Sequence, residues 1–95
     1  MIRIMARITA RAGSEGELRQ VLQELPGPSC REEGCLGYEL FLNEDDPREF
    51  VTVERWRDQG AADAHLNSAH VAAVIARASG LLAQPPLIHR FRQIA

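Results

Sequence analysis

The sequence predicts an α+β fold, a ferredoxin-like βαββαβ domain whose four strands form one antiparallel sheet. Three observations predict it. First, four segments carry the alternating or β-branched patterns of strands. Second, one region of helical periodicity lies between the first and second strands and another between the third and fourth. Third, a polar turn joins the two central strands. Because 95 residues leave no room for a second core, a single domain is expected over residues 1–95.

The first strand and the first helix are predicted by periodicity. Residues 2–10 alternate, and one side of the strand carries Ile2, Ile4, Ala6, Ile8 and Ala10. Gly13 ends the strand, and Ser14 with Glu17 predicts a capping box at the start of a helix. The apolar stripe of that helix is Leu18, Val21, Leu22 and Leu25. Pro26-Gly27-Pro28 is expected to interrupt the helix, because proline cannot donate the backbone hydrogen bond.

The second and third strands are predicted at residues 35–43 and 49–57, joined by the polar residues 43–48 as a hairpin. Apolar side chains occur on both faces of the third strand, with Val51 and Val53 opposite Phe50 and Trp56. Two helices can cover only one face of a four-stranded sheet. A second copy of the chain is therefore expected to cover the other face, which predicts a homodimer whose sheets face each other.

The second helical region is predicted in two parts. Asp58 is the expected N-cap of a helix over residues 59–66, and Asn67-Ser68 interrupts the pattern, with Ser68 as the cap of the next helix. The stripe of this next helix is Val71, Val74, Ile75, Ala78 and Leu82. Pro85 and Pro86 end it, and residues 87–94 form the last predicted strand.

Composition excludes several classes of function. The net charge is −2 and the basic residues are scattered, which argues against a nucleic-acid partner. No apolar run approaches the ~20 residues of a membrane span, and arginines interrupt the N-terminal apolar residues, so a cytoplasmic protein without a membrane partner is expected. Cys30 and Cys35 are then expected to be reduced thiols, and their spacing is a poor zinc signature.

Three segments resemble the antibiotic biosynthesis monooxygenase (ABM) domain: residues 34–40 (GCLGYEL), 53–58 (VERWRD) and 64–70 (AHLNSAH). The resemblance extends from about Ile2 to about Gln93. It implies a dimeric α+β barrel. Characterised enzymes of the family oxidise quinol-like or polyketide aromatic substrates with O₂, without metal, flavin or haem. Other members are isomerases or haem-degrading proteins.

The resemblance thus implies a cofactor-independent monooxygenase that oxidises a small quinol-like or hydroxylated aromatic molecule. Such a reaction needs a base near neutrality, a dry apolar cavity and donors for the substrate anion. We expect His65 or His70 to be the base, Trp56 and Tyr38 to shape the pocket, and Arg7 to neutralise an anion. The two facing sheets of the dimer are expected to enclose the apolar chamber beside Trp56.

Neither a cofactor nor a metal is expected. On a continuous helix, His65 and His70 would face roughly 140° apart, although the break at Asn67-Ser68 would change this angle, and their spacing is not that of a zinc-binding helix. The positions that hold haem in the haem-degrading branch correspond to Ala6 and about Ile75, which cannot ligate iron.

Structural roles remain open for each candidate residue: a helix end for the histidines, core or interface packing for the aromatic residues, and a surface or interface ion pair for Arg7. Glu54 is expected to pair with an arginine across the strands. Two alternative functions also stay open, a non-catalytic small-molecule-binding dimer and an isomerase or degradative enzyme that acts on a small metabolite.

Overall fold

The computed structural model describes all residues of the chain, 1–95. Its elements follow the predicted order. A short helical turn was expected over residues 29–33, and the structure has a short helix that begins earlier, at Pro26; a single 3₁₀ turn is additional. The elements are β1 (Ile2–Thr9), α1 (Glu15–Leu22), α2 (Pro26–Cys30), β2 (Cys35–Leu42), β3 (Glu49–Trp56), α3 (Gln59–Leu66), α4 (Ala69–Ala78), the 3₁₀ turn Ser79–Leu81, and β4 (Leu87–Phe91). All neighbouring strands are antiparallel, in the order β2-β3-β1-β4. This confirms the ferredoxin-like α+β fold.

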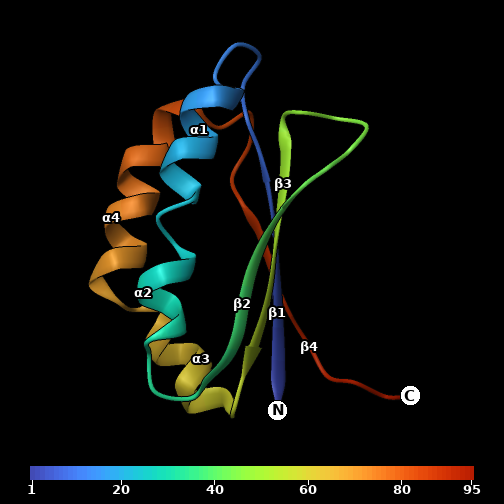
Figure 1. Ribbon diagram of the computed structural model, residues 1–95, viewed down its shortest axis with the longest axis vertical. Coiled ribbons are helices and arrows are strands. Elements are labelled where there is room, and N and C mark those ends of the chain that lie inside the picture. Colours follow the sequence, from blue (N-terminus) through green and yellow to red (C-terminus); the bar gives the residue numbers. More distant parts are fainter.

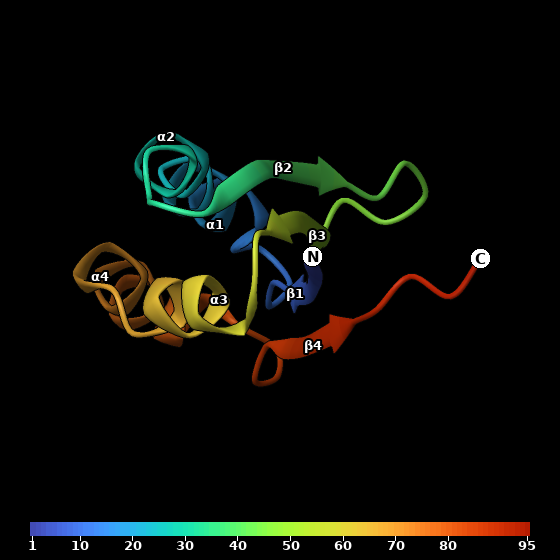
Figure 2. The same cartoon turned by 90° about the horizontal axis from the view of Figure 1, so that it is seen from below.

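The molecule has two layers, a sheet and a layer of helices that covers one face of it (Figures 1 and 2). The helix-facing side chains of β1 and β3 alternate with outward ones, as the sequence predicted. They form the core with the buried side chains of α1 and α4, which are Leu18, Val21, Leu22, Val71, Val74 and Ala78. Ile75, which was predicted to belong to the buried stripe of α4, is exposed. Trp56 lies on this inner face and is fully buried. None of the helices is both long enough and apolar enough to cross a bilayer.

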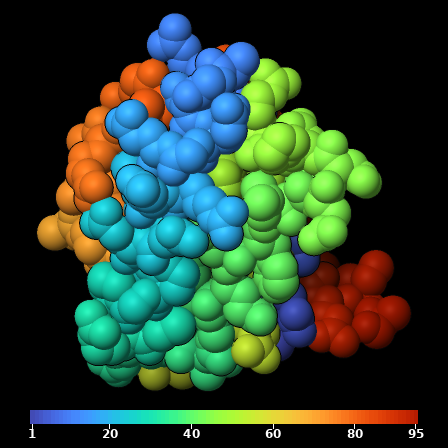
Figure 3. All heavy atoms as spheres, turned by 45° about the horizontal axis from the view of Figure 1, so that its top comes forward, coloured from blue at the N-terminus to red at the C-terminus, as the bar shows by residue number.

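The outer face of the sheet has no covering layer within the chain. Apolar side chains there remain accessible, including Met5 and Phe91, which are 37% and 47% exposed. The C-terminal residues project from the body of the molecule (Figure 3), and Ile94 among them is 89% exposed. Such a face is typical of a surface that another chain covers.

The ends of α1 differ from the prediction. The Ser14 hydroxyl makes no capping hydrogen bond, so the predicted capping box is wrong; instead, the Glu15 carboxylate accepts the N–H of Gly13, whose φ of +90° suits glycine. The helix already ends at Leu22, and Pro26 begins α2. Proline is well suited to the first turn of a helix, where its missing N–H has no partner to lose. The prolines therefore start a new helix and do not cut into α1.

The junction between α3 and α4 is the predicted break at Asn67-Ser68. Asp58 caps α3 as expected, since its Oδ1 accepts the N–H of Ala61 at 2.9 Å. Ser68, by contrast, makes no capping bond to α4; its hydroxyl donates to the carbonyl of His65 at 2.6 Å. This turn redirects the chain, so the start of α4 lies beside the end of α3.

Candidate active site

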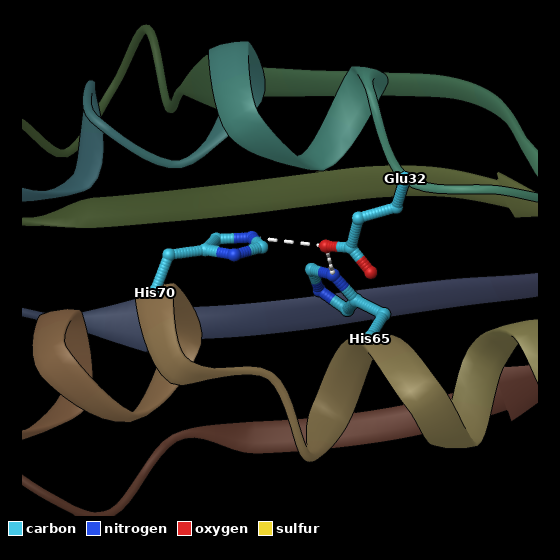
Figure 4. A group of neighbouring side chains, drawn as sticks. All are labelled: Glu32, His65 and His70. Atoms are coloured by element: carbon cyan, nitrogen blue, oxygen red, sulfur yellow. Dashed lines mark hydrogen bonds and ion pairs between the residues drawn. The ribbon is translucent and has the colours of Figure 1, made fainter.

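Three side chains from separate segments meet under the sheet: His65 from α3, His70 from α4 and Glu32 from the loop after α2 (Figure 4). The Nδ1 atom of His65 lies 2.8 Å from Oε1 of Glu32, and Nε2 of His70 lies 2.9 Å from the same oxygen. The hydroxyl of Ser29 is 3.1 Å from Nε2 of His70. One carboxylate oxygen thus joins the two imidazoles, and the break between the helices makes this possible.

The loop that carries Glu32 is held in place by backbone contacts. The Glu32 carbonyl accepts the N–H of Cys35 at 3.1 Å, and the Gly34 carbonyl accepts the N–H of Arg57 at 2.8 Å. Gly34 has a φ of +82°, and a Cβ on it would lie 2.5 Å from that of Ala61. Only glycine fits this close approach of the loop to α3. The loop is therefore anchored to the beginning of the helix that bears His65.

A second carboxyl group, that of Glu54, lies on the other side of His65. Its Oε1 is 3.4 Å from Nε2 of His65 and accepts the indole N–H of Trp56 at 3.1 Å. Its Oε2 accepts the hydroxyl of Thr52 at 2.7 Å, and that hydroxyl oxygen accepts the N–H of Ala6 at 3.2 Å. The alternation of β3 places Thr52, Glu54 and Trp56 together on the inner face.

The expectation that Glu54 pairs with an arginine across the strands is wrong. Its neighbours across the sheet are Ile4 of β1 and Tyr38 of β2. The nearby Arg55 points to the opposite face, because successive side chains of a strand alternate. Glu54 has the imidazole of His65 as its ionisable partner instead.

Burial controls the electrostatics of this site. Desolvation raises the pKa of Glu54 above its ordinary range; the hydrogen bonds from Thr52 and Trp56 and the charge of His65 oppose this rise. The pKa of Tyr38 is also raised, first by burial and then by the negative charges of Glu54 and Glu32. Tyr38 therefore remains a phenol, which can donate a hydrogen bond, while the carboxyl group of Glu54 can exchange a proton closer to neutral pH than an exposed glutamate.

A cavity of about 60 Å³ lies between the inner face of the sheet and the helices. Its wall is mostly apolar, and its polar side chains are those of Tyr38, Thr52, Glu54 and His65. Two of its lining residues, Ile75 on α4 and Ile88 on β4, are partly exposed, at 48% and 41%. The cavity consequently approaches solvent between α4 and the segment that leads into β4.

Of the five predicted site residues, three lie close to His65, which is itself the fourth: they are Tyr38, Trp56 and His70. His65 and Tyr38 line the cavity, with ring centroids 5.4 Å apart. Trp56 does not line it, but its ring centroid is 4.5 Å from that of His65. His70 lies beyond His65 and outside the cavity, beside Glu32.

Arg7 is separated from these residues. It lies on the outer face of the sheet, where its Nε is 3.6 Å from a carboxylate oxygen of Glu49. The expected position of the chamber is also corrected: the cavity beside His65 lies within one chain, between sheet and helices. The reason is that Trp56 faces the helices and not the uncovered side of the sheet.

The donor set of Glu32, His65 and His70 has the nitrogen and carboxylate types that bind zinc or iron, and the three atoms lie within 4.8 Å of one another. The sequence argument that the two histidines face apart does not apply, because the helix is broken between them. These atoms are already matched as hydrogen-bond donors and acceptors. Ala6 and Ile75 both line the cavity and offer no iron ligand.

Sequence reasoning missed Thr52, Glu32 and Ser29 and gave Glu54 only a structural role as the partner of an arginine. Glu54 and Thr52 had a usable signal, since the alternation that places Phe50 and Trp56 on one face places these two beside them. No periodicity marks Glu32, which lies in a loop.

Comparisons with known proteins identify the family. The sequence model described as "Antibiotic biosynthesis monooxygenase" matches residues 1–77. YcnE of Bacillus subtilis is 32% identical over 85 residues, which cover 90% of each chain, and Rv0793 of Mycobacterium tuberculosis is 32% identical over 84 residues, which cover 88% of this chain and 82% of its own. Both carry provisional names as monooxygenases.

Solved structures agree with this match. The structure of Rv0793 has a TM-score of 0.91 at 29% identity and covers 99% of this chain and 95% of its own. PA3566 from Pseudomonas aeruginosa also has a TM-score of 0.91, at 33% identity, with 99% of this chain and 94% of its own covered. The profile match, the curated relatives and the shared fold lead to one conclusion: this chain belongs to the antibiotic biosynthesis monooxygenase family.

Proposed function

We propose that this protein is a cofactor-independent monooxygenase that oxidises a small quinol-like or hydroxylated aromatic molecule with O₂. One observation carries the proposal: the Glu54–His65 pair is buried and forms part of the wall of an otherwise apolar cavity. Membership of a family named for monooxygenases supports the class of reaction.

The substrate supplies the electrons in this proposal. Loss of a hydroxyl proton gives an electron-rich anion that reacts with O₂. With naphthalene-1,4-diol, the products are 2-hydroxy-1,4-naphthoquinone and water, so one oxygen atom enters the ring and the other leaves as water with two hydrogens. Oxidation of the diol to the quinone and hydroxylation of the ring together deliver the four electrons that O₂ accepts. No other reductant is needed.

Each polar group of the cavity has a role in this reaction. The Glu54–His65 pair accepts the hydroxyl proton, since burial moves the pKa of Glu54 toward neutrality, the range in which proton transfer is most effective. Tyr38 remains protonated and donates a hydrogen bond to the substrate oxygen. The apolar wall excludes water, which strengthens these interactions.

The size of the cavity limits the substrate. An engineered protein cavity of roughly 150 Å³ binds benzene, whereas this one measures about 60 Å³. An aromatic ring therefore enters only if the wall moves at the partly exposed side, near Ile75 and Ile88. This favours one or two rings over a larger polyketide.

Oxygen uptake tests the proposal. The wild-type protein is expected to consume O₂ with benzene-1,4-diol or naphthalene-1,4-diol faster than buffer does. We expect His65→Gln and Glu54→Gln to lose this rate by about 100-fold or more, as is typical of general acid–base residues. Glu17→Gln makes the same chemical change on an exposed residue of α1 and is expected to keep the rate.

Two other results contradict the proposal. Exchange of substrate protons without O₂ consumption would indicate an isomerase. Thermal stabilisation by these compounds, with uptake no faster than in buffer, would indicate a binding protein without catalysis.

We also infer that a second copy of the chain covers the outer face of the sheet. Several observations support this homodimer: Met5 and Phe91 are exposed there, and the face carries a hollow of about 330 Å³, which is lined by Met5, Ala6, Arg7, Val51, Leu87, His89 and Phe91. The projecting C-terminal segment adds the exposed Ile94 (Figure 3). An apolar sheet face of this kind gains stability when it is removed from water.

A further inference from the structure

The polar side chains around His65 form a continuous series from the cavity to the surface. Glu54 and His65 have side chains that are only 3% exposed, whereas those of Glu32 and His70 are 18% and 26% exposed. The successive separations are 3.4 Å from Glu54 to His65, 2.8 Å from His65 to Glu32 and 2.9 Å from Glu32 to His70. The first two residues of the series contribute to the cavity wall, and the last two do not.

We propose that Glu32 and His70 form a proton relay that connects the buried Glu54–His65 pair with solvent. This inference rests on the proposed function and adds two residues to it. Glu32 and His70 do not touch the cavity, so they act through His65 as positioning and proton-transfer groups.

The chemistry of the proposed product requires such a route. In 2-hydroxy-1,4-naphthoquinone, the new hydroxyl is conjugated to a carbonyl group and is therefore acidic. When the product leaves as its anion, the balance is one diol and one O₂ giving one anion, one water and one proton. That proton stays behind in an enclosed apolar site. The Glu54–His65 pair can accept a proton from the next substrate molecule only after this first proton has left.

The atoms of the imidazole suit this transfer. The two ring nitrogens of His65 face different carboxyl groups, Nε2 toward Glu54 and Nδ1 toward Glu32. A proton that arrives at Nε2 allows another to leave from Nδ1. The receiving Oε1 of Glu32 also contacts Nε2 of His70, so the next step begins at the same oxygen. Both steps use contacts that already exist (Figure 4).

No permanent cation lies next to the relay, so the positive charge that moves along it is the transferred proton. The carboxyl groups of Glu32 and Glu54 contact histidine nitrogens, and neither contacts an arginine. The other titratable groups that face the relay are the phenol of Tyr38 on β2 and, next to it, the thiols of Cys30 and Cys35. None of these is a permanent cation that would hold the carboxylates in their charged form.

Turnover of naphthalene-1,4-diol by Glu32→Gln and His70→Gln tests the relay. We expect kcat to fall by about 10-fold or more with KM unchanged, because substrate binding does not involve either residue. Added imidazole is expected to restore part of the rate of His70→Gln, and the solvent deuterium isotope effect on kcat is expected to rise in both variants. Glu17→Gln is the matched control. Wild-type kcat in both variants, or a loss in His70→Gln that imidazole does not restore, would overturn the relay.

A second measurement does not depend on turnover and so separates this inference from the proposed function. In ¹H–¹⁵N NMR spectra of the imidazoles, N–H protons that His65 and His70 donate to the Glu32 carboxylate are expected to be shifted downfield in the wild type. They are expected to be less shifted in Glu32→Gln, which offers only a neutral acceptor. Wild-type spectra without these shifted signals would overturn the relay even if the enzyme is active, and their presence would support it even if no O₂ is consumed.

Titration with Zn²⁺ tests whether Glu32, His65 and His70 bind a metal ion instead. The relay predicts no stoichiometric binding, because the three atoms are occupied by one another. Tight binding of one Zn²⁺ that disappears in Glu32→Gln would show that the cluster holds a cation, and it would overturn the relay.

Discussion

Glu54 is the residue on which the proposed chemistry depends most. Its carboxyl group accepts two hydrogen bonds from its own strand and faces His65, with 3% of its side chain exposed. An ionised group in such a place persists only with these partners. The alternation of β3 places Glu54 on the same face of the strand as Phe50 and Trp56, although the sequence did not show that the helices cover this face. It did not reveal the partner, because His65 is close to Glu54 only in the folded chain.

The stability of the fold is expected to depend on pH through Glu54. Its pKa is raised in the folded protein above the ordinary value of 4.5, so the folded state holds the proton more tightly than the unfolded chain. Its contribution to the free energy of unfolding is therefore largest below pH 4.5 and is lost as the pH rises through the folded pKa. Glu54→Gln removes this dependence.

Urea unfolding at a series of pH values above 4.5 measures the effect. The free energy of unfolding of Glu54→Gln is expected to fall less steeply with pH than that of the wild type. Glu17→Gln, which changes an exposed carboxyl group, is expected to keep the wild-type slope. Equal slopes for the wild type and Glu54→Gln would contradict the raised pKa.

Thr52 is expected to stabilise the fold through its hydroxyl group. Thr52→Val keeps the shape of the side chain but leaves Oε2 of Glu54 and the N–H of Ala6 without this buried partner. We expect a loss of about 1–3 kcal/mol in the free energy of unfolding, measured with urea. Thr52→Ser retains the hydroxyl and removes one methyl group, so it should be the more stable of the two. A Thr52→Val protein as stable as Thr52→Ser would show that these hydrogen bonds contribute little.

The junction of α3 and α4 determines the geometry of the candidate site at the scale of elements. The break at Asn67-Ser68 was predictable, because two polar residues interrupt an apolar helical pattern. Because of this break, His70 turns back toward His65, and their ring centroids are 5.9 Å apart. This arrangement was not predictable, since the direction of α4 depends on its packing against α1. In the same way, the prolines after α1 predicted an interruption, while the structure uses them to begin α2.

Asp58, the cap of α3, is expected to stabilise the helix that carries His65. The pKa of Asp58 is lowered, first by the hydrogen bond from the Ala61 N–H and then by the one from Arg57. A lowered pKa adds stability above the ordinary value of 3.8, and this is lost as the pH falls through the folded pKa. Asp58→Ala should therefore unfold at lower urea concentration than the wild type at neutral pH.

Asp58→Asn is the matched control, because asparagine also accepts the hydrogen bond at an N-cap. It should lie closer to the wild type than Asp58→Ala does. The difference between the wild type and Asp58→Ala should shrink in acid. The same urea midpoint for all three proteins would mean that the cap does not stabilise α3.

At the scale of the whole molecule, the fold could be predicted and the position of the cavity could not. The order of elements and the length of the chain led to the ferredoxin-like sheet with its two faces. Both faces carry apolar residues, and the pattern of β3 alone does not show which of them the helices cover. The helices pack on the face of Phe50 and Trp56, so the cavity formed inside one chain.

The outer face of the sheet is expected to form the dimer interface. Sedimentation of the wild type at micromolar concentration should give twice the mass of one chain. Phe91→Glu introduces a charge into the exposed apolar surface and should give monomers, because an unpaired charge is costly to bury. Gln20→Glu, an exposed change on α1, should remain dimeric. A monomeric wild type would contradict the proposed homodimer.

Reaction with ¹⁸O₂ tests the proposed oxygenation most directly. With naphthalene-1,4-diol, the account predicts a hydroxynaphthoquinone that carries one labelled oxygen atom, at a rate that falls in Glu54→Gln and His65→Gln but not in Glu17→Gln. A product without label, or labelled product formed equally fast by all four proteins, would contradict the assignment of this buried pair as the proton acceptor of a monooxygenase.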